Sequence, residues 1–166
     1  DENGKNISNL ISQSFLLNKA SGKKISLAEP PSKAYAATGA FTLVDGVQNN
    51  LGMSKSAQFL GFSGKDLEAI IDLDSITSID NIILHAFEQT GSWIYRPGEV
   101  SFYTSTDGKT FTMLEIVTNI NDNRHLKYVC RTKTQTRYIK ILAKNKGTSQ
   151  RAFRVPAIKP GYLHMK

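Results

Sequence analysis

Short runs in which apolar and polar residues alternate recur along this chain and predict strands. In residues 100–105, VSFYTS, every second residue (Val100, Phe102 and Thr104) would face a core, which is the two-residue period of a half-buried strand. Further runs rich in β-branched and large apolar residues occupy residues 15–19, 24–27, 67–73, 79–87, 111–117, 137–143 and 161–165. The sequence therefore predicts an all-β sandwich or jelly roll.

Turn residues separate these runs. The Asp107-Gly108 pair tolerates the positive φ of a tight hairpin, so the two flanking strands should pair directly. Residues 20–22, ASG, predict a second hairpin near the start, between the runs at 15–19 and 24–27. One helical stripe occurs, and it allows a short helix over residues 8–13.

The length of 166 residues is typical of one domain. We expect residues 1–13 to be a lead segment or linker and residues 14–166 to form the domain.

Cys130 is the lone cysteine, so we expect a small buried thiol and no internal disulfide. No run of about 20 apolar residues is present, so no membrane span is predicted. The chain begins at Asp1 without a methionine, which suggests a fragment or a processed chain.

The formal net charge is +7, a balance that favours acidic partners. The positive charge is concentrated late in the chain, at Arg131, Lys133, Arg137, Lys140, Lys144, Lys146, Arg151, Arg154 and Lys159. A module for nucleic acid would combine such a patch with stacking aromatics along a groove. Here the basic residues are spread singly over strands and loops, as on a solvated sheet face, so nucleic-acid binding is not predicted.

The sequence carries no recognisable catalytic motif. The three histidines, His85, His125 and His164, are dispersed, without the spacing of a metal-ligand pair. His85 lies in a strand on the side of Ile83 and Phe87, which favours a hydrogen-bonded core histidine. We therefore expect no enzymatic activity in this chain.

An aromatic loop between two predicted strands is the leading candidate for a binding site. Residues 90–96, TGSWIYR, contain the only tryptophan, Trp93, with Tyr95 and Arg96 beside it. A sugar ring can pack its C–H face on an aromatic ring while polar groups bind its hydroxyls. Phe59 and Phe62 predict a second aromatic loop for the same ligand. The alternative is that Trp93 folds inward and plugs the end of the core, because large aromatics are mostly buried.

Residues 41–50, FTLVDGVQNN, form a second candidate site. The Asp45 carboxylate, the turn at Gly46 and the side-chain amides that follow could surround a hard cation, with backbone carbonyls as further ligands. The alternative is an Asx turn, in which Asp45 accepts local backbone N–H groups. The residues alone leave both interpretations open.

Four segments, read together, resemble a known family. FTLVDGV, GFSGKDLEAIIDL, TGSWIYRPGEVSFYTSTDGKTF and TRYIKILAKN occur in this order, at the spacing of discoidin domains (coagulation factor 5/8 type C, carbohydrate-binding module family 32). The likeness covers residues 15–145. It is most similar to the C-terminal discoidin-like domain of bacterial family 20 glycoside hydrolases, the β-N-acetylhexosaminidases or chitobiases.

The resemblance implies an eight-stranded antiparallel jelly-roll sandwich without catalysis of its own. It implies a structural calcium ion (Ca2+) with Asp45 as side-chain ligand, joined by carbonyls around Thr42 and Val47 and by Asn50. It places sugar binding at loops on one end, near Phe62 and Trp93. The implied partners are a glycan of amino-sugar or galactose type and the catalytic domain of the same parent protein.

By the same resemblance, the parent would be periplasmic, cell-surface or secreted in a bacterium. Two other roles remain open for the domain. It could be a structural unit that packs on the catalytic domain without binding sugar, or an adhesion module for a protein or an anionic surface, which the basic charge permits.

Overall fold

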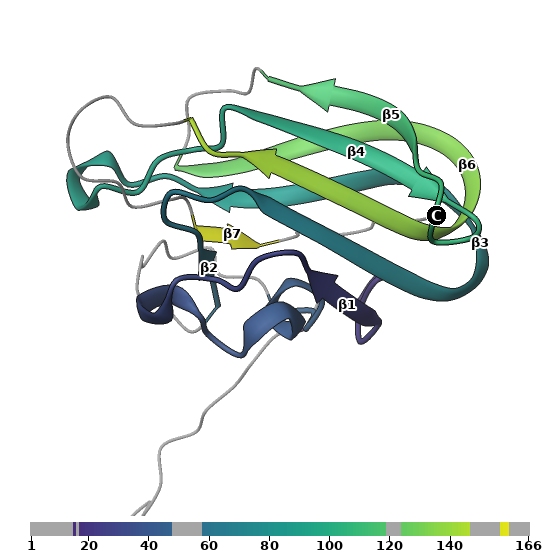
Figure 1. The fold of residues 1–166 in the computed structure, drawn as a ribbon, viewed down its shortest axis with the longest axis horizontal. Coiled ribbons are helices and arrows are strands. Elements are labelled where there is room, and N and C mark those ends of the chain that lie inside the picture. The colour runs from purple at the N-terminus through teal and green to yellow at the C-terminus, as the bar shows by residue number, and fades with distance from the viewer. Residues whose placement is uncertain (1–14, 16, 48–57, 119–123, 147–156, 160–166) are drawn as a thin grey trace, which may run out of the picture.

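The computed structural model describes residues 15, 17–47, 58–118, 124–146 and 157–159 (Figure 1). These residues form strands β1 (Lys24–Leu27), β2 (Leu60–Gly61), β3 (Leu67–Phe87), β4 (Glu99–Ser105), β5 (Thr112–Val117), β6 (His125–Lys144) and β7 (Ala157–Lys159). They also form three short 3-10 helices, η1 (Lys33–Tyr35), η2 (Gly39–Leu43) and η3 (Thr90–Ser92). The predicted all-β class is confirmed.

Every strand pairing within the described residues is antiparallel. The strands follow the order β2-β7-β3-β6-β4-β5, and β1 pairs with the first half of β3. The described part of the chain shows seven strands. The eight-stranded jelly roll stays a prediction, although the antiparallel arrangement is consistent with a sandwich.

The two longest strands, β3 and β6, shape the core. They pair along nearly their whole length and curve over at one end of the molecule (Figure 1). Their register shifts between Asp72 and Thr77, where the curve lies. Ile71 before this shift and Leu84 after it are both fully buried in one hydrophobic cluster. The two halves of β3 therefore enclose the same core, as two layers of a sandwich do.

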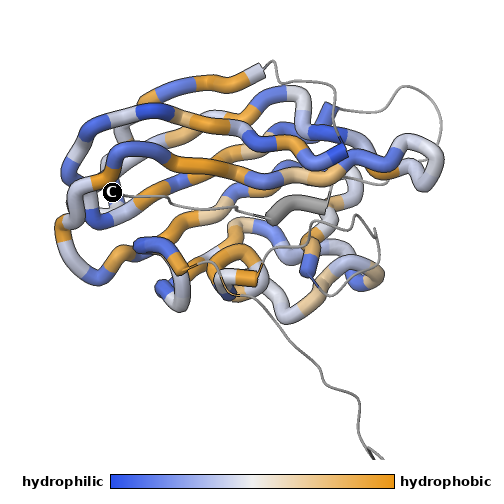
Figure 2. The backbone as a smooth tube through the Cα atoms, turned by 180° about the vertical axis from the view of Figure 1, so that it is seen from behind, coloured by the Kyte–Doolittle hydropathy of each residue, from blue (hydrophilic) through white to orange (hydrophobic). Residues whose placement is uncertain are grey.

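Side chains alternate along these strands as the sequence predicted. Ile139, Ile141 and Ala143 of β6 are buried, while Lys140 and Lys144 between and after them face outward. Figure 2 shows the same alternation of hydrophilic and hydrophobic positions along several strands. Burial of one face supplies the main driving force for this fold.

The hairpin between β4 and β5 forms at the predicted Asp107-Gly108 turn. Gly108 has φ +74°, a backbone conformation that side chains disfavour. Asp107 Oδ1 accepts the backbone N–H groups of Lys109 at 2.8 Å and Thr110 at 2.9 Å. These hydrogen bonds lower the pKa of Asp107 to about 2.

The predicted hairpin between residues 15–19 and 24–27 is wrong. Strand β1 pairs with β3, with Lys24 opposite Asp72, and among the described residues Phe15 forms an isolated bridge to Val47. Ile25 and Leu27 pack against the core by lying beside β3, whereas Leu17 is 78% exposed. The helix predicted over residues 8–13 and the strand over 161–165 lie outside the described residues.

The predicted strands at 67–73 and 79–87 are halves of one strand, β3, and the run at 137–143 is the end of β6. The first half of β6 was not among the predicted strands. Exposed Arg131, Lys133 and Gln135 alternate there with half-buried threonines, so the apolar period is interrupted.

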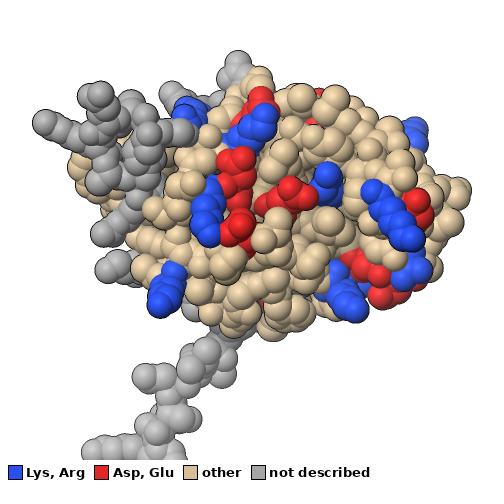
Figure 3. Space-filling view, in the orientation of Figure 1, with Lys and Arg blue, Asp and Glu red and all other residues tan. Residues whose placement is uncertain are grey.

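Opposite charges are paired across the outer face that contains β4 and the last part of β6 (Figure 3). Lys144 contacts Glu99 at 2.7 Å, and Arg137 contacts Asp72 at 2.8 Å. Lys65 forms an ion pair with Glu29 at the edge of this sheet. Two of the late basic residues, Arg137 and Lys144, are therefore neutralised locally.

Candidate functional site

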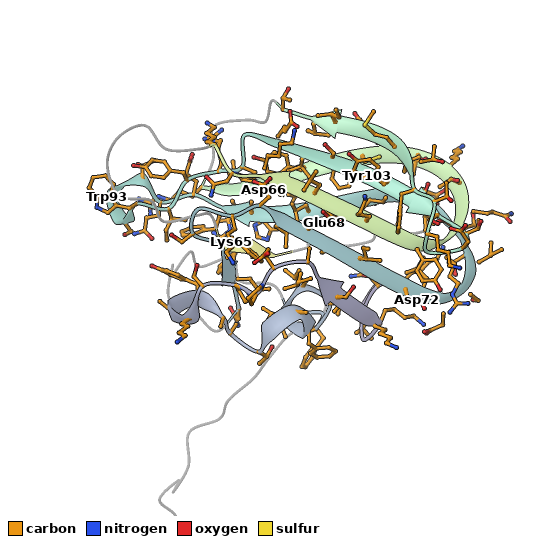
Figure 4. All side chains as sticks on the ribbon, in the orientation of Figure 1. Lys65, Asp66, Glu68, Asp72, Trp93 and Tyr103 are labelled. Atoms are coloured by element: carbon orange, nitrogen blue, oxygen red, sulfur yellow. The ribbon has the colours of Figure 1, made fainter. Side chains whose placement is uncertain are left out.

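The predicted aromatic loop connects β3 to β4 and projects from one end of the sandwich. Figure 4 shows Trp93 at the outermost point of this end. The backbone of Gln89 and Ile94 forms two hydrogen bonds, of 2.9 and 3.1 Å, in the manner of a small antiparallel bridge. Helix η3 closes the loop between them, with Trp93 N–H donating to the Thr90 carbonyl at 2.9 Å. Backbone hydrogen bonds therefore fix the conformation of the loop tip.

A side-chain pair holds the base of this loop. Glu88 Oε1 accepts the backbone N–H of Arg96 at 3.0 Å, and Glu88 Oε2 accepts Arg96 Nε at 2.8 Å. Both side chains are largely buried, with exposed fractions of 16% and 19%. Burial of Glu88 acts to raise its pKa, but the hydrogen bonds from Arg96 outweigh it and lower the pKa. The pair is therefore a charged clamp across the loop.

The end of the loop is fixed to β6. The Tyr128 hydroxyl donates to the Pro97 carbonyl at 3.1 Å, and Gly98 N–H donates to the Lys144 carbonyl at 2.8 Å. Burial raises the pKa of Tyr128 to about 12, so this hydroxyl stays a donor. Both ends of the loop thus rest on rigid strands.

Trp93 lies outside the core. Trp93 is 49% exposed, whereas the neighbouring Ile94 is 1% exposed. Trp93 also has φ +61° and ψ +31°, the left-handed conformation. For a bulky residue this conformation is uncommon, and such backbone strain gathers at functional sites. The alternative that Trp93 plugs the core is therefore not observed, because the residue is about half exposed.

The other predicted sugar-contacting residues differ in accessibility. Tyr95 is half-buried next to the exposed ring. Arg96 Nε is held by Glu88, so the side chain that was expected to bind hydroxyls mainly supports the loop. The sequence could not show this, because Glu88 lies at the other end of the loop.

Phe59 and Phe62 are buried, at 0% and 1% exposure, so the second aromatic loop is absent. Phe62 belongs to the main core, and Phe59 packs on Phe87 with ring centroids 5.4 Å apart. Neither ring offers a face to a ligand, because both rings are buried among other apolar side chains. The exposed tip nearby is polar and spans residues 63–66.

A family model matches most of this chain. Residues 28–155 match the model of the F5/8 type C domain. The chain belongs to the F5/8 type C domain family. No curated protein matches the chain.

Solved structures share the fold of this F5/8 type C domain. A fucose-binding module of Streptococcus pneumoniae, SpX-3, is 12% identical with a TM-score of 0.58, and the match covers 89% of this chain and 98% of that chain. The Clostridium perfringens module CpGH89CBM32-4, in complex with GlcNAc-α-1,4-galactose, is 19% identical with a TM-score of 0.54, and 92% and 98% are covered. A GH29 fucosidase of Ruminococcus gnavus is 22% identical with a TM-score of 0.54 over 90% of this chain and 28% of that chain. At these identities the likeness shows the fold alone.

Two histidines of the F5/8 type C domain meet although they are far apart in sequence. His85 Nε2 lies 3.1 Å from His125 Nδ1, because β3 and β6 pair with Phe87 opposite His125. His85 is fully buried, so the predicted hydrogen-bonded core histidine is confirmed. Sequence spacing could not reveal the pair.

Cys130 is buried as predicted, and burial raises its pKa to about 12, which removes its nucleophilic thiolate at neutral pH.

The geometry around Asp45 is that of an Asx turn. Asp45 Oδ1 accepts the Val47 N–H at 2.8 Å, and Gly46 has φ +73°. The Thr42 hydroxyl is buried and lies 2.7 Å from the Thr38 hydroxyl, while Asn50 lies outside the described residues. Within the described ranges no three acidic, histidine or cysteine side chains cluster as metal ligands. The expected ligand set also includes backbone carbonyls and Asn50, so calcium binding stays a prediction.

Proposed function

We propose that this F5/8 type C domain is a non-catalytic carbohydrate-binding module whose contact surface is the loop carrying Trp93. The observation that carries the proposal is the half-exposed ring of Trp93, held in a left-handed conformation on a loop fixed at both ends. The modules of similar fold include one in complex with GlcNAc-α-1,4-galactose and one that binds fucose. They support the same class of ligand here.

The physical basis is a preformed apolar face at an aqueous surface. A tryptophan ring provides a large contact area with few rotatable bonds, so little conformational entropy is lost on binding. The Glu88–Arg96 clamp and the Tyr128–Pro97 hydrogen bond hold the loop before ligand arrives. Such a shallow site would reach roughly millimolar to micromolar dissociation constants, about 4 to 8 kcal/mol.

Polar side chains at the same end would bind the hydroxyls of the sugar. Lys65 and Asp66 lie in the half of the sheet nearer to Trp93 (Figure 4). Asp66 accepts the Asn145 N–H at 2.8 Å, and Asn145 Nδ2 donates to the Lys65 carbonyl at 3.4 Å. These bonds join the loop at 63–66 to the end of β6. The two loops together would form the rim of the sugar site.

We propose further that the parent protein is a bacterial glycoside hydrolase, of family 20 as the sequence resemblance implies, acting in the periplasm, at the cell surface or outside the cell. A solved fucosidase in which a domain of this fold covers 28% of the chain supports an enzyme as parent. Among the described residues, no helix is long and apolar enough to cross a membrane.

Glycan binding and binding to the catalytic domain should be measured side by side. A glycan array with the wild-type chain, repeated with Trp93→Ala, tests the function. The proposal predicts selective glycan signals that the variant loses. A chain that binds no glycan but binds the parent's catalytic domain would be a structural unit, and binding only to protein or to anionic surfaces would indicate adhesion.

A further inference from the structure

A hollow of about 580 Å³ lies on the outer face of the second half of β3 and the first half of β6. It is lined by Asp80, Asn81, Ile83, Val129, Arg131, Thr132 and Lys133. Ile83, the lining residue nearest to the loop along β3, is four residues before the end of this strand at Phe87, so about 13 Å of strand separates the hollow from the start of the Trp93 loop. The hollow is therefore separate from the proposed sugar site.

A β-bulge forms this hollow. Ile79 is opposite Thr134 and Asn81 is opposite Arg131, so β6 has one more residue than β3 in this interval. Such bulges bend a strand and redirect its side chains. Here Thr132 and Lys133 share the position opposite Asp80.

Two cations of the hollow, Arg131 and Lys133, form no ion pair with any residue that the structure describes. Of the late basic residues, Arg137 and Lys144 form ion pairs, and Lys140 lies over the Tyr103 ring at 4.6 Å. Arg131 and Lys133 are both exposed. Across the part of the chain that the structure describes, neither of their side chains forms an ion pair or a hydrogen bond. The positive charge left after local pairing thus includes these two residues at one hollow.

The rest of the lining suits a hydroxylated ligand. Ile83 and Val129 provide an apolar floor, and both are half-buried. Asp80 can accept hydroxyl donors. The side-chain oxygen of Asn81 is buried and has no hydrogen-bond partner among the described residues, a state that costs about 1–3 kcal/mol. A rotation of this amide would allow a ligand hydroxyl to satisfy it.

We propose that this hollow is a second binding site, which takes an acidic oligosaccharide through its carboxylate or sulfate groups. Arg131 and Lys133 bind the anionic group, and the apolar floor packs against the sugar ring. The described lining of the hollow contains no aromatic side chain, whereas single-strand nucleic-acid sites stack bases on aromatic rings. The Asp80 carboxylate also disfavours a continuous row of phosphates. A saccharide with spaced charges and free hydroxyls fits this lining best.

The test is calorimetric titration of the whole chain with a chondroitin 4-sulfate tetrasaccharide. Arg131→Gln combined with Lys133→Gln should weaken binding about 10-fold, since two charge-assisted contacts are lost. Lys24→Gln combined with Lys33→Gln removes the same charge from exposed positions elsewhere and should change binding less than 2-fold. In a Trp93→Ala background the Arg131→Gln and Lys133→Gln pair should still weaken binding about 10-fold, which separates this site from the proposed sugar site.

Three further arms make the result decisive. The desulfated tetrasaccharide keeps its carboxylates, so its affinity tells which anionic group is bound. In wild-type protein, the methyl resonances of Ile83 and Val129 should shift on titration, independently of any variant. Equal losses in both double variants, or equally tight binding of single-stranded DNA of the same charge, would overturn the proposal in favour of non-specific attraction to a basic protein.

Discussion

Glu88 binds both the backbone amide and the guanidinium of Arg96, eight residues further along the chain. This pair closes the loop that presents Trp93, at the point where β3 ends. A sugar-binding ring is useful only when its position is set before ligand arrives, because ordering a loop on binding reduces affinity. The ion pair therefore connects the fold to the proposed function.

Replacing Glu88 by Ala should weaken glycan binding about 10-fold and lower the free energy of unfolding by about 2 kcal/mol, because a charged, largely buried hydrogen-bonding group is lost. Glu88→Gln keeps an oxygen that can accept the Arg96 N–H and should lose less on both measures. Urea unfolding and glycan titration of both variants check this. Unchanged glycan affinity in Glu88→Ala would show that the clamp does not position the ring.

Replacing Trp93 should remove binding while leaving the fold stable. The exposed ring contributes little to the core, so Trp93→Ala should cost less than the 3–5 kcal/mol typical of buried aromatics, roughly 1 kcal/mol. Trp93→Gly should be at least as stable as Trp93→Ala, because glycine adopts positive φ without strain. Thermal melting of the two variants gives the comparison. A melting loss in Trp93→Ala as large as for a core aromatic would contradict the exposed position.

Ile94 provides the matched control for Trp93. Its side chain is 1% exposed, so Ile94→Ala should destabilise the protein by about 2–5 kcal/mol. At temperatures where the variant is folded, it should still bind glycan. Urea unfolding and glycan titration on the same preparation measure both effects. If Ile94→Ala were harmless and Trp93→Ala severe, the assignment of core and surface would be reversed.

The strand regions with a clean two-residue period were predictable. Val100 and Phe102 of β4 face the hydrophobic core of the domain as expected, because one buried face fixes the register of the strand. The Asp107-Gly108 turn was equally predictable, since its local hydrogen bonds need no distant partner.

The contacts that sequence could not predict are those that depend on distant partners. Phe59 and Phe62 stand beside polar loop residues, yet tertiary packing buries them. The same limit applies to His85 and His125, which meet only because β3 and β6 pair. For Trp93, the sequence left open whether the ring is a platform for sugar or folds inward and plugs the end of the core. The exposure of Trp93 in the structure is inconsistent with the plug, and the sugar platform stays a proposal.

The Asp72–Arg137 ion pair should make stability depend on acidity. The side-chain hydrogen bonds from Arg137, of 2.8 and 2.9 Å, lower the pKa of Asp72 from 3.8 to about 2. The unfolded chain therefore takes up a proton first as the pH falls. The contribution of this ion pair to the free energy of unfolding is complete above about pH 4 and is lost as the pH falls towards 2. Urea unfolding at pH 6, 4 and 3 should show a shallower decline for Asp72→Asn than for wild type. Parallel curves would show that this pair does not contribute.

The Asx turn at Asp45 makes a prediction that also tests the calcium site. Asp45→Ala removes the acceptor for the Val47 N–H and should cost about 1 kcal/mol. Asp45→Asn keeps an acceptor oxygen and should cost less. Melting of all three proteins in calcium and in chelator completes the test. Equal wild-type melting in both would indicate a turn alone, whereas a calcium-dependent rise that Asp45→Asn abolishes would show a bound ion.

Because the chain contains a single tryptophan, its indole reports directly on the proposed site. The decisive measurement is a titration of wild-type protein with GlcNAc-α-1,4-galactose and with fucose, following the Trp93 fluorescence and its indole N–H resonance. The account predicts a saturable change in both signals for at least one sugar, which Glu88→Ala weakens. A sugar that binds by calorimetry without perturbing the indole, or the absence of binding by either sugar, would contradict the assignment of Trp93 as the sugar platform.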